Sequence, residues 1–169
     1  MRRQHQKLAQ LDRLDLKIIT ALLREGRISK VQLSEQVGLS ATPCWERIKK
    51  LEKSGIIRGY HADIDLSRLV NISYFRVEIT LNSYSMAAAN RFEKTVKAMP
   101  EVIECEAVLG GLDYVLKIAA TSTESYREIM ENLLDEEGMD FDFRTFPITK
   151  PVKSFSDSSV IELIETMDI

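Results

Sequence analysis

Cysteine and histidine are scarce in this chain of 169 residues, which has two of each. Cys44 and Cys105 are too few for a disulfide framework, and with His5 and His61 they show no metal-ligand spacing. We expect two buried thiols in a reducing cytoplasm, with no metal and no cofactor. No stretch approaches the roughly 18 apolar residues of a membrane helix, and residues 1–12 lack the apolar core of a signal peptide. The expectation is therefore a cytoplasmic protein without a membrane partner.

A large charge of one sign is also missing, because the whole chain carries only −3. Residues 1–60 nevertheless hold 13 Lys and Arg against 6 Asp and Glu, a balance of +7. Residues 61–169 hold the remaining 10 against 20, a balance of −10. This asymmetry indicates that the first part binds a polyanion and that the second part does not.

The basic part begins with two predicted helices. Asp12 can cap the first, which ends near Gly26, and Ser29 can cap the second, which Gly38 stops. Apolar residues recur at helical spacing on one face of each and predict a shared core: Leu14, Ile18, Leu22, Leu33 and Val37.

A third helix follows the break at residues 38–40. Its N-cap is Ser40 or Thr42, and either choice leaves Pro43 in the first turn, where a missing N–H costs nothing. Gly55 ends the helix, and residues 56–65 follow as an extended wing or connector. The buried stripe is formed by Cys44, Ile48 and Leu51. Two short helices joined in this way predict a helix-turn-helix, which lays its second helix in the major groove of double-stranded DNA.

The outward face of the third helix supplies the candidate DNA contacts. Trp45 either reads a thymine methyl or sugar, or covers the neighbouring helix. The basic side chains are candidates for neutralising phosphates, with a solvated charged face as the alternative. The candidate DNA-binding residues are Ser40, Thr42, Pro43, Trp45, Glu46, Arg47, Lys49, Lys50 and Lys53.

The second part predicts a β-α-β-β-α-β order. The expected strands are residues 74–81, 102–108, 113–119 and 141–149, and the expected helices are residues 86–99 and 122–134. This order is the ferredoxin-like arrangement, in which both helices cover one face of an antiparallel sheet. Pro147 places the last strand at an edge or a bulge. The whole chain is thus expected to be α+β.

We expect four segments: a DNA-binding domain at 1–60, a linker at 61–71, the second domain at 72–153 and a tail at 154–169. The tail is either a weak helix or a disordered end. The face of the sheet that no helix covers predicts oligomerisation through residues 61–169, whereas residues 1–60 alone should be monomeric.

A glycine-rich loop connects two of the predicted strands. Gly110 and Gly111 let backbone N–H groups approach a ligand, and Asp113 can accept from an ammonium group. Taken alone, this loop favours a plain hairpin turn over a ligand site. No arrangement of His, Ser or glycine-rich residues in the chain is that of a catalytic centre.

Four stretches follow one another in a telling order: LDRLDLKII, GRISKVQLSEQVGLSATPCWERIKKLEKSGIIRGY, GGLDYVLKI and TSTESYREIMENLL. Taken in that order, they resemble the Lrp/AsnC (feast/famine) family of transcription regulators over residues 11–153. The resemblance implies a winged helix-turn-helix joined to a ligand-binding, oligomerising domain, often called RAM. It also implies dimers that assemble into tetramers or octamers, with amino acids bound between subunits.

Carried onto this chain, the resemblance places the recognition helix at residues 42–54. It implies the effector-binding residues Gly110, Gly111, Asp113, Tyr114, Thr123, Phe146 and Ile148. Many members have an Asp where this chain has Gly111, which removes one ligand contact. Some have a larger apolar residue where this chain has Thr123, so a small or polar effector is expected.

The function expected is that of a homo-oligomeric DNA-binding transcription regulator modulated by an amino acid or related metabolite. One alternative is a stand-alone RAM-like metabolite sensor without DNA function, which the basic helix-turn-helix argues against. The other is an enzyme on a ferredoxin-like fold, which the missing catalytic residues argue against.

Overall fold

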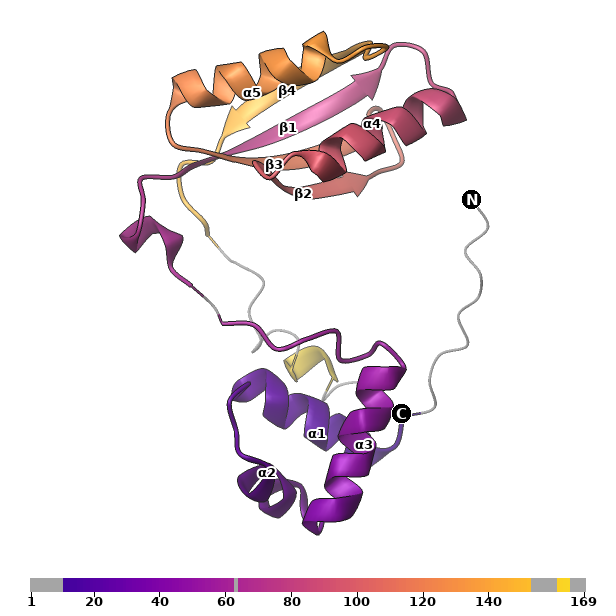
Figure 1. Ribbon diagram of the computed structural model, residues 1–169, viewed down its shortest axis with the longest axis vertical. Coiled ribbons are helices and arrows are strands. Elements are labelled where there is room, and N and C mark those ends of the chain that lie inside the picture. The colour runs from indigo at the N-terminus through magenta and orange to yellow at the C-terminus, as the bar shows by residue number, and fades with distance from the viewer. Residues whose placement is uncertain (1–10, 63, 153–160, 165–169) are drawn as a thin grey trace. The chain divides into compact units, whose positions relative to one another are not determined.

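The computed structural model describes residues 11–62, 64–152 and 161–164 (Figure 1). Contacts divide the chain into two units, one formed by Met1–Asp63 with Lys153–Ile169 and the other by Ile64–Val152. The division falls inside the segment predicted as a linker. Of the predicted tail, residues 161–164 are helical and the remainder lies outside the described residues.

The first unit contains three helices, α1 (Arg13–Arg24), α2 (Lys30–Val37) and α3 (Ala41–Lys53). Capping boxes open α1 at Asp12 and α2 at Ser29. Gly38 ends α2 in the left-handed conformation at φ +76°, which suits a residue without Cβ. Ser40 is the N-cap of α3, which decides between the two predicted caps, although its side chain forms no cap hydrogen bond.

The core of the first unit contains most of the residues predicted from helical spacing, whereas Leu14 and Leu22 are only half-buried. Ile18, Leu33, Val37, Cys44, Ile48 and Leu51 are all buried. Residues 56–62 after α3 form a connector that contains no strand. The prediction of two buried thiols is wrong for Cys105, which is exposed because it lies on an edge strand.

The second unit is an antiparallel sheet with strand order β2-β3-β1-β4. Its elements are a short 3-10 helix η1 (Leu66–Arg68), β1 (Ser73–Leu81), α4 (Met86–Ala98), β2 (Val102–Ala107), β3 (Tyr114–Ala120), α5 (Thr123–Asp135) and β4 (Phe141–Pro147). This confirms the predicted ferredoxin-like fold. It also confirms that Pro147 lies on an edge strand.

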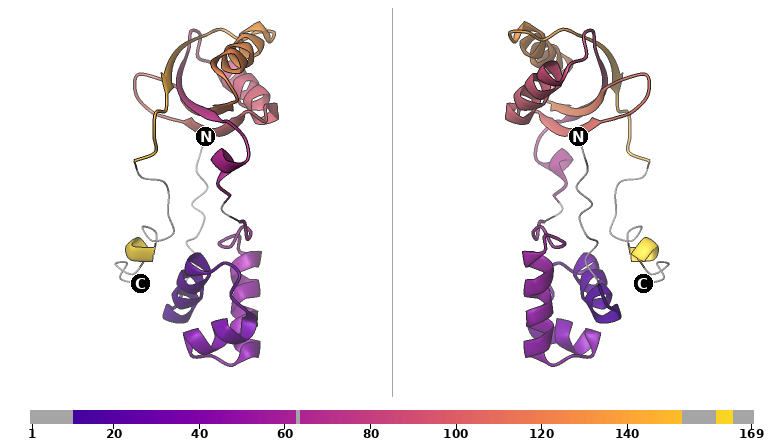
Figure 2. Two further views of the ribbon diagram at one scale, coloured as in Figure 1. Left: turned by 90° about the vertical axis from the view of Figure 1, so that its left-hand side faces the viewer. Right: turned by 90° about the vertical axis from the view of Figure 1, so that its right-hand side faces the viewer.

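Both helices of the second unit cover the same face of its sheet (Figure 2). Alternate residues of β1 and β3 point into this layer and are buried, whereas their neighbours face the other side. That other face carries ion pairs between Lys117 and Glu104 and between Arg144 and Glu78. It also carries Phe146, opposite Arg76 in the pairing of β1 with β4. The face that no helix covers therefore mixes apolar and charged groups.

Among the described residues, no helix is long and apolar enough to cross a membrane.

Candidate nucleic-acid interface and effector site

The exposed face of α3 carries most of the predicted DNA-binding residues. The exposed residues are Ser40, Thr42, Glu46, Lys49, Lys50 and Lys53, and Pro43 is half-buried at the third helical position. No acidic residue lies in the first turn, and Lys50 and Lys53 lie in the last. The helix thus presents polar groups near its N-terminus and three lysines along its length, an arrangement suited to base edges and phosphates.

Trp45 joins α3 to α2. Its side chain is half-buried against the core of the first unit. The Nζ of Lys30, on α2, lies 3.6 Å from the centre of the ring, and the Nζ of Lys49 lies 5.4 Å from it. Both contacts are cation–π interactions. Of the two predicted roles for Trp45, this packing supports the covering of the neighbouring helix. Sequence spacing did not identify Lys30 as its partner.

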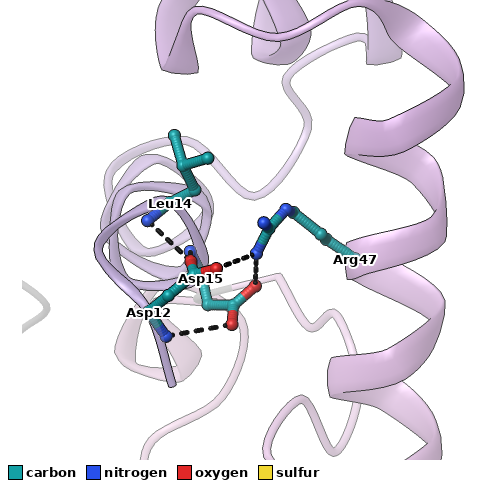
Figure 3. Close-up of polar contacts among 4 residues, drawn as sticks. All are labelled: Asp12, Leu14, Asp15 and Arg47. Carbon is teal, nitrogen blue, oxygen red and sulfur yellow. Dashed lines mark hydrogen bonds and ion pairs between the residues drawn. The ribbon is translucent and has the colours of Figure 1, made fainter. Parts of the chain in front are cut away.

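Arg47 is held by two carboxylates and is not a free cation on the surface. Its Nη1 donates to Asp12 Oδ2 over 2.7 Å and to Asp15 Oδ1 over 2.6 Å (Figure 3). The hydrogen bonds and the charge of these two partners raise the pKa of Arg47 above its usual value. The charge of Arg47 is already paired within the chain, which favours a role inside the protein, and its predicted phosphate contact stays a prediction.

In the predicted effector loop, only Gly110 has a backbone conformation that requires glycine. Its φ is +142°, whereas Gly111 has no positive φ, and a Cβ at either position would meet nothing within 4 Å. The carboxylate of Asp113 accepts from the backbone N–H of Leu81 over 2.8 Å, and the Asp113 N–H donates to the Ile79 carbonyl over 2.9 Å. Asp113 thus fastens the loop to the end of β1, a structural role that the sequence argument did not anticipate.

Tyr114 is a core residue. Its side chain is only 3% exposed, and its ring lies 4.6 Å from that of Phe92. Its hydroxyl donates to Glu93 Oε1 over 3.3 Å. Burial, with the nearby Glu93 carboxylate, raises the pKa of Tyr114 to about 12. The geometry thus gives Tyr114 a packing role, and its predicted effector contact stays a prediction.

The other predicted effector residues lie at the opposite end of the sheet. Phe146 pairs with Arg76, the Ile148 N–H donates to the Tyr74 carbonyl, and Thr123 is the exposed first residue of α5. The loop, by contrast, is fastened at Leu81. Leu81 lies five residues along the strand from Arg76, which corresponds to roughly 17 Å. Within one chain the predicted effector residues therefore form two groups that cannot share one small ligand.

Two hollows in the described part of the surface do not join these groups. A cleft of about 420 Å³ beside α4 and β2 contains Tyr114 but no other predicted effector residue. A groove of about 740 Å³ in the first unit, between α1 and the connector after α3, contains none. In the part of the chain that the structure describes, no three His, Cys, Asp or Glu side chains are grouped to hold a metal ion.

Comparison with known proteins identifies both units. Residues 11–58 match a family model described as winged helix-turn-helix DNA-binding. Residues 75–157 match the Lrp/AsnC ligand binding domain. The two matches follow the order of the helical unit and the sheet unit.

Two relatives are transcription regulators. The chain is 42% identical over 157 residues to the transcriptional regulatory protein DoeX of Halomonas elongata, which covers 92% of this chain and 99% of DoeX. It is 40% identical over 144 residues to the leucine-responsive regulatory protein of Escherichia coli, which covers 85% of this chain and 87% of that protein.

Solved structures give the same result. An AsnC family transcriptional regulator from Agrobacterium tumefaciens superposes with a TM-score of 0.78 at 30% identity, covering 85% of this chain and 94% of the other. A transcriptional regulator from Neisseria meningitidis, in complex with L-Met, superposes with a TM-score of 0.77 at 31% identity, covering 85% and 93%.

A helix-turn-helix unit followed by a ligand-binding unit defines a DNA-binding transcription regulator whose activity a small molecule modulates. The chain belongs to the Lrp/AsnC family of such regulators.

Proposed function

We propose that this regulator binds double-stranded DNA with the exposed face of α3, and that an amino acid or related metabolite held by the second unit alters this binding. The observation that carries the proposal is the arrangement of α3, in which Lys49, Lys50 and Lys53 are exposed while the core stripe is buried. The balance of +7 over residues 1–60 supports it.

The residues of α3 have different roles in this proposal. The three lysines neutralise phosphates and supply affinity without sequence information. Thr42 and Glu46 lie on the same exposed face and reach base edges, where a hydroxyl or a carboxylate can discriminate between bases. Ser40 and Pro43 set the start of the helix against the DNA backbone.

The effector site lies between two copies of the chain in this proposal. Gly110 and Gly111 at one end of the sheet would meet Thr123, Phe146 and Ile148 from the other end of a partner's sheet. The separation of roughly 17 Å within one chain supports this assignment, because only a second copy can bring the two groups together. The L-Met bound to the Neisseria regulator supports an amino acid as the effector. The regulator is therefore a homo-oligomer in this proposal.

Lys49→Ala tests the DNA-binding surface. We expect it to weaken binding to every duplex by a similar factor and to lower the slope of log affinity against log salt by about 1, because one phosphate contact is lost. Gel shifts over a range of salt concentrations measure both quantities. Lys94→Ala, an exposed lysine on α4, is the matched control and should change neither.

A chain that binds no duplex at low salt would contradict the proposal and favour the alternative of a metabolite sensor without DNA function. Equal salt slopes for Lys49→Ala and Lys94→Ala would remove α3 from the phosphate-binding surface.

A further inference from the structure

Arg47 closes a polar network at the start of α1. Asp12 Oδ1 accepts from the backbone N–H groups of Leu14 and Asp15, each over 2.9 Å. Asp15 Oδ2 accepts from the Asp12 N–H over 3.2 Å. The two remaining carboxylate oxygens both accept from Arg47 Nη1 (Figure 3). Each of the four oxygens thus has a defined partner.

This network contains a buried carboxylate, whose charge and oxygens need partners. The side chain of Asp15 is 3% exposed and that of Arg47 is 28% exposed. A buried carboxylate is stable only when its charge is paired and its oxygens are hydrogen-bonded. The Arg47 guanidinium therefore has one favourable position, which the first turn of α1 determines.

This position fixes the rotation of α3 about its own axis. Arg47 directly follows Glu46 and precedes Lys49 by two residues, and neighbouring side chains on a helix are separated by about 100°. A helix held at Arg47 therefore presents Glu46 and Lys49 in one defined direction. The core residues Cys44 and Ile48 lie about 60° and 100° around the helix from Arg47 and hold the face beside it.

We infer that Arg47 is a positioning residue for DNA recognition: with Asp12 and Asp15 it sets the orientation in which α3 presents its base-reading side chains. This inference rests on the proposed DNA-binding role of α3. The competing assignment is a direct phosphate contact, for which the guanidinium has donors besides Nη1.

Neutralising the carboxylates separates these two assignments. Asp12→Asn keeps an N-cap side chain, and Asp15→Asn keeps the shape of the buried group. Each substitution makes the protein more positive, which by charge alone strengthens binding to all duplexes. If Arg47 positions α3, the same substitutions should instead weaken binding to a preferred duplex about tenfold relative to a scrambled one, roughly the loss of one base contact.

The experiment uses the full chain and a duplex that it selects from a random-sequence library, with a scrambled duplex of equal composition as the reference. Arg47→Gln should lower the ratio of the two affinities to the same extent as Asp15→Asn and leave the salt slope unchanged. Arg127→Gln is the matched control, because Arg127 also bridges two carboxylates, those of Glu124 and Glu131 on α5. Circular dichroism sets a temperature at which every variant is folded, and Asp12→Asn is the mildest variant if Asp15→Asn is unstable.

The inference is overturned if Asp12→Asn and Asp15→Asn keep or raise the affinity ratio, or if Arg47→Gln lowers the salt slope by about 1. If the proposed DNA-binding function is wrong, the unmodified chain will select no duplex from the library, and the inference about Arg47 is then wrong as well.

Discussion

Three side chains that the sequence predicts as ligand contacts interact with other residues of the same chain. Asp113 accepts from the backbone of β1, Tyr114 is buried beside Phe92, and Arg47 is paired with two carboxylates. The Asp113 and Arg47 interactions join residues 32 to 35 positions apart. Periodicity and capping report on neighbours within a helix or strand, so they could place these residues on a face but could not name their partners.

Other residues were predictable because their signals are local. Asp12 and Ser29 were identified as caps from residue type and position alone, and the buried stripe of α3 followed from spacing. The exposure of Thr42, Glu46 and Lys49 followed from that stripe by exclusion. The candidate DNA surface was thus largely predictable, whereas the candidate effector site was predictable only as a set of residues without its geometry.

The raised pKa of Tyr114 predicts a loss of stability at alkaline pH. The folded chain keeps the phenol neutral up to about 12, whereas an unfolded chain ionises it near 10.0. The contribution is therefore fully present below pH 10 and is lost as the pH rises through about 12. Tyr114→Phe keeps the contact with Phe92 and removes the hydroxyl, so its unfolding midpoint in urea should fall less over this range. Parallel curves for both proteins would show that Tyr114 ionises equally well in the folded state.

At the scale of elements, the strands and helices of the sheet unit could be predicted from the residues that end them. Pro147 marked an edge strand, and β4 is at the edge of the sheet because a proline cannot donate to a further neighbour. The loop from residue 108 to 113 was harder to interpret, because two glycines predict both a turn and a ligand site. The structure shows that these two glycines are not equivalent.

Gly110→Ala and Gly111→Ala form a matched pair for this loop. Neither added Cβ meets an atom within 4 Å, but only Gly110 has a positive φ, at +142°. We expect Gly110→Ala to destabilise the loop by about 1 kcal/mol or more and to weaken the effector response, because the backbone conformation is strained for alanine.

Gly111→Ala should leave stability nearly unchanged. Amide hydrogen exchange of Asp113 and Leu81, followed with and without L-Met as the probe, measures both effects. Equal exchange in the two variants would show that the loop tolerates a side chain at Gly110.

At the scale of the whole molecule, the separation of the effector residues predicts complementation between chains. A Gly110→Ala chain and a Phe146→Ala chain should each respond poorly to the effector as pure oligomers. In a mixed dimer, one site combines the two altered ends and the other site combines two unaltered ends. Because about half of the dimers in an equal co-refolded mixture are mixed, such mixtures should recover about a quarter of the binding sites. Titration calorimetry with L-Met measures the number of sites, and mixtures that recover none would place the whole site within a single chain.

The network at Asp12, Asp15 and Arg47 also limits how this DNA-binding helix can be transplanted. A design that moves α3 alone onto another scaffold leaves Arg47 without its carboxylates, since these are contributed by a segment more than 30 residues earlier. The smallest part that contains this network is α3 together with the first turn of α1. A chimaera built on that pair should keep the sequence preference of its parent, whereas a graft of the isolated helix should keep only its attraction to DNA.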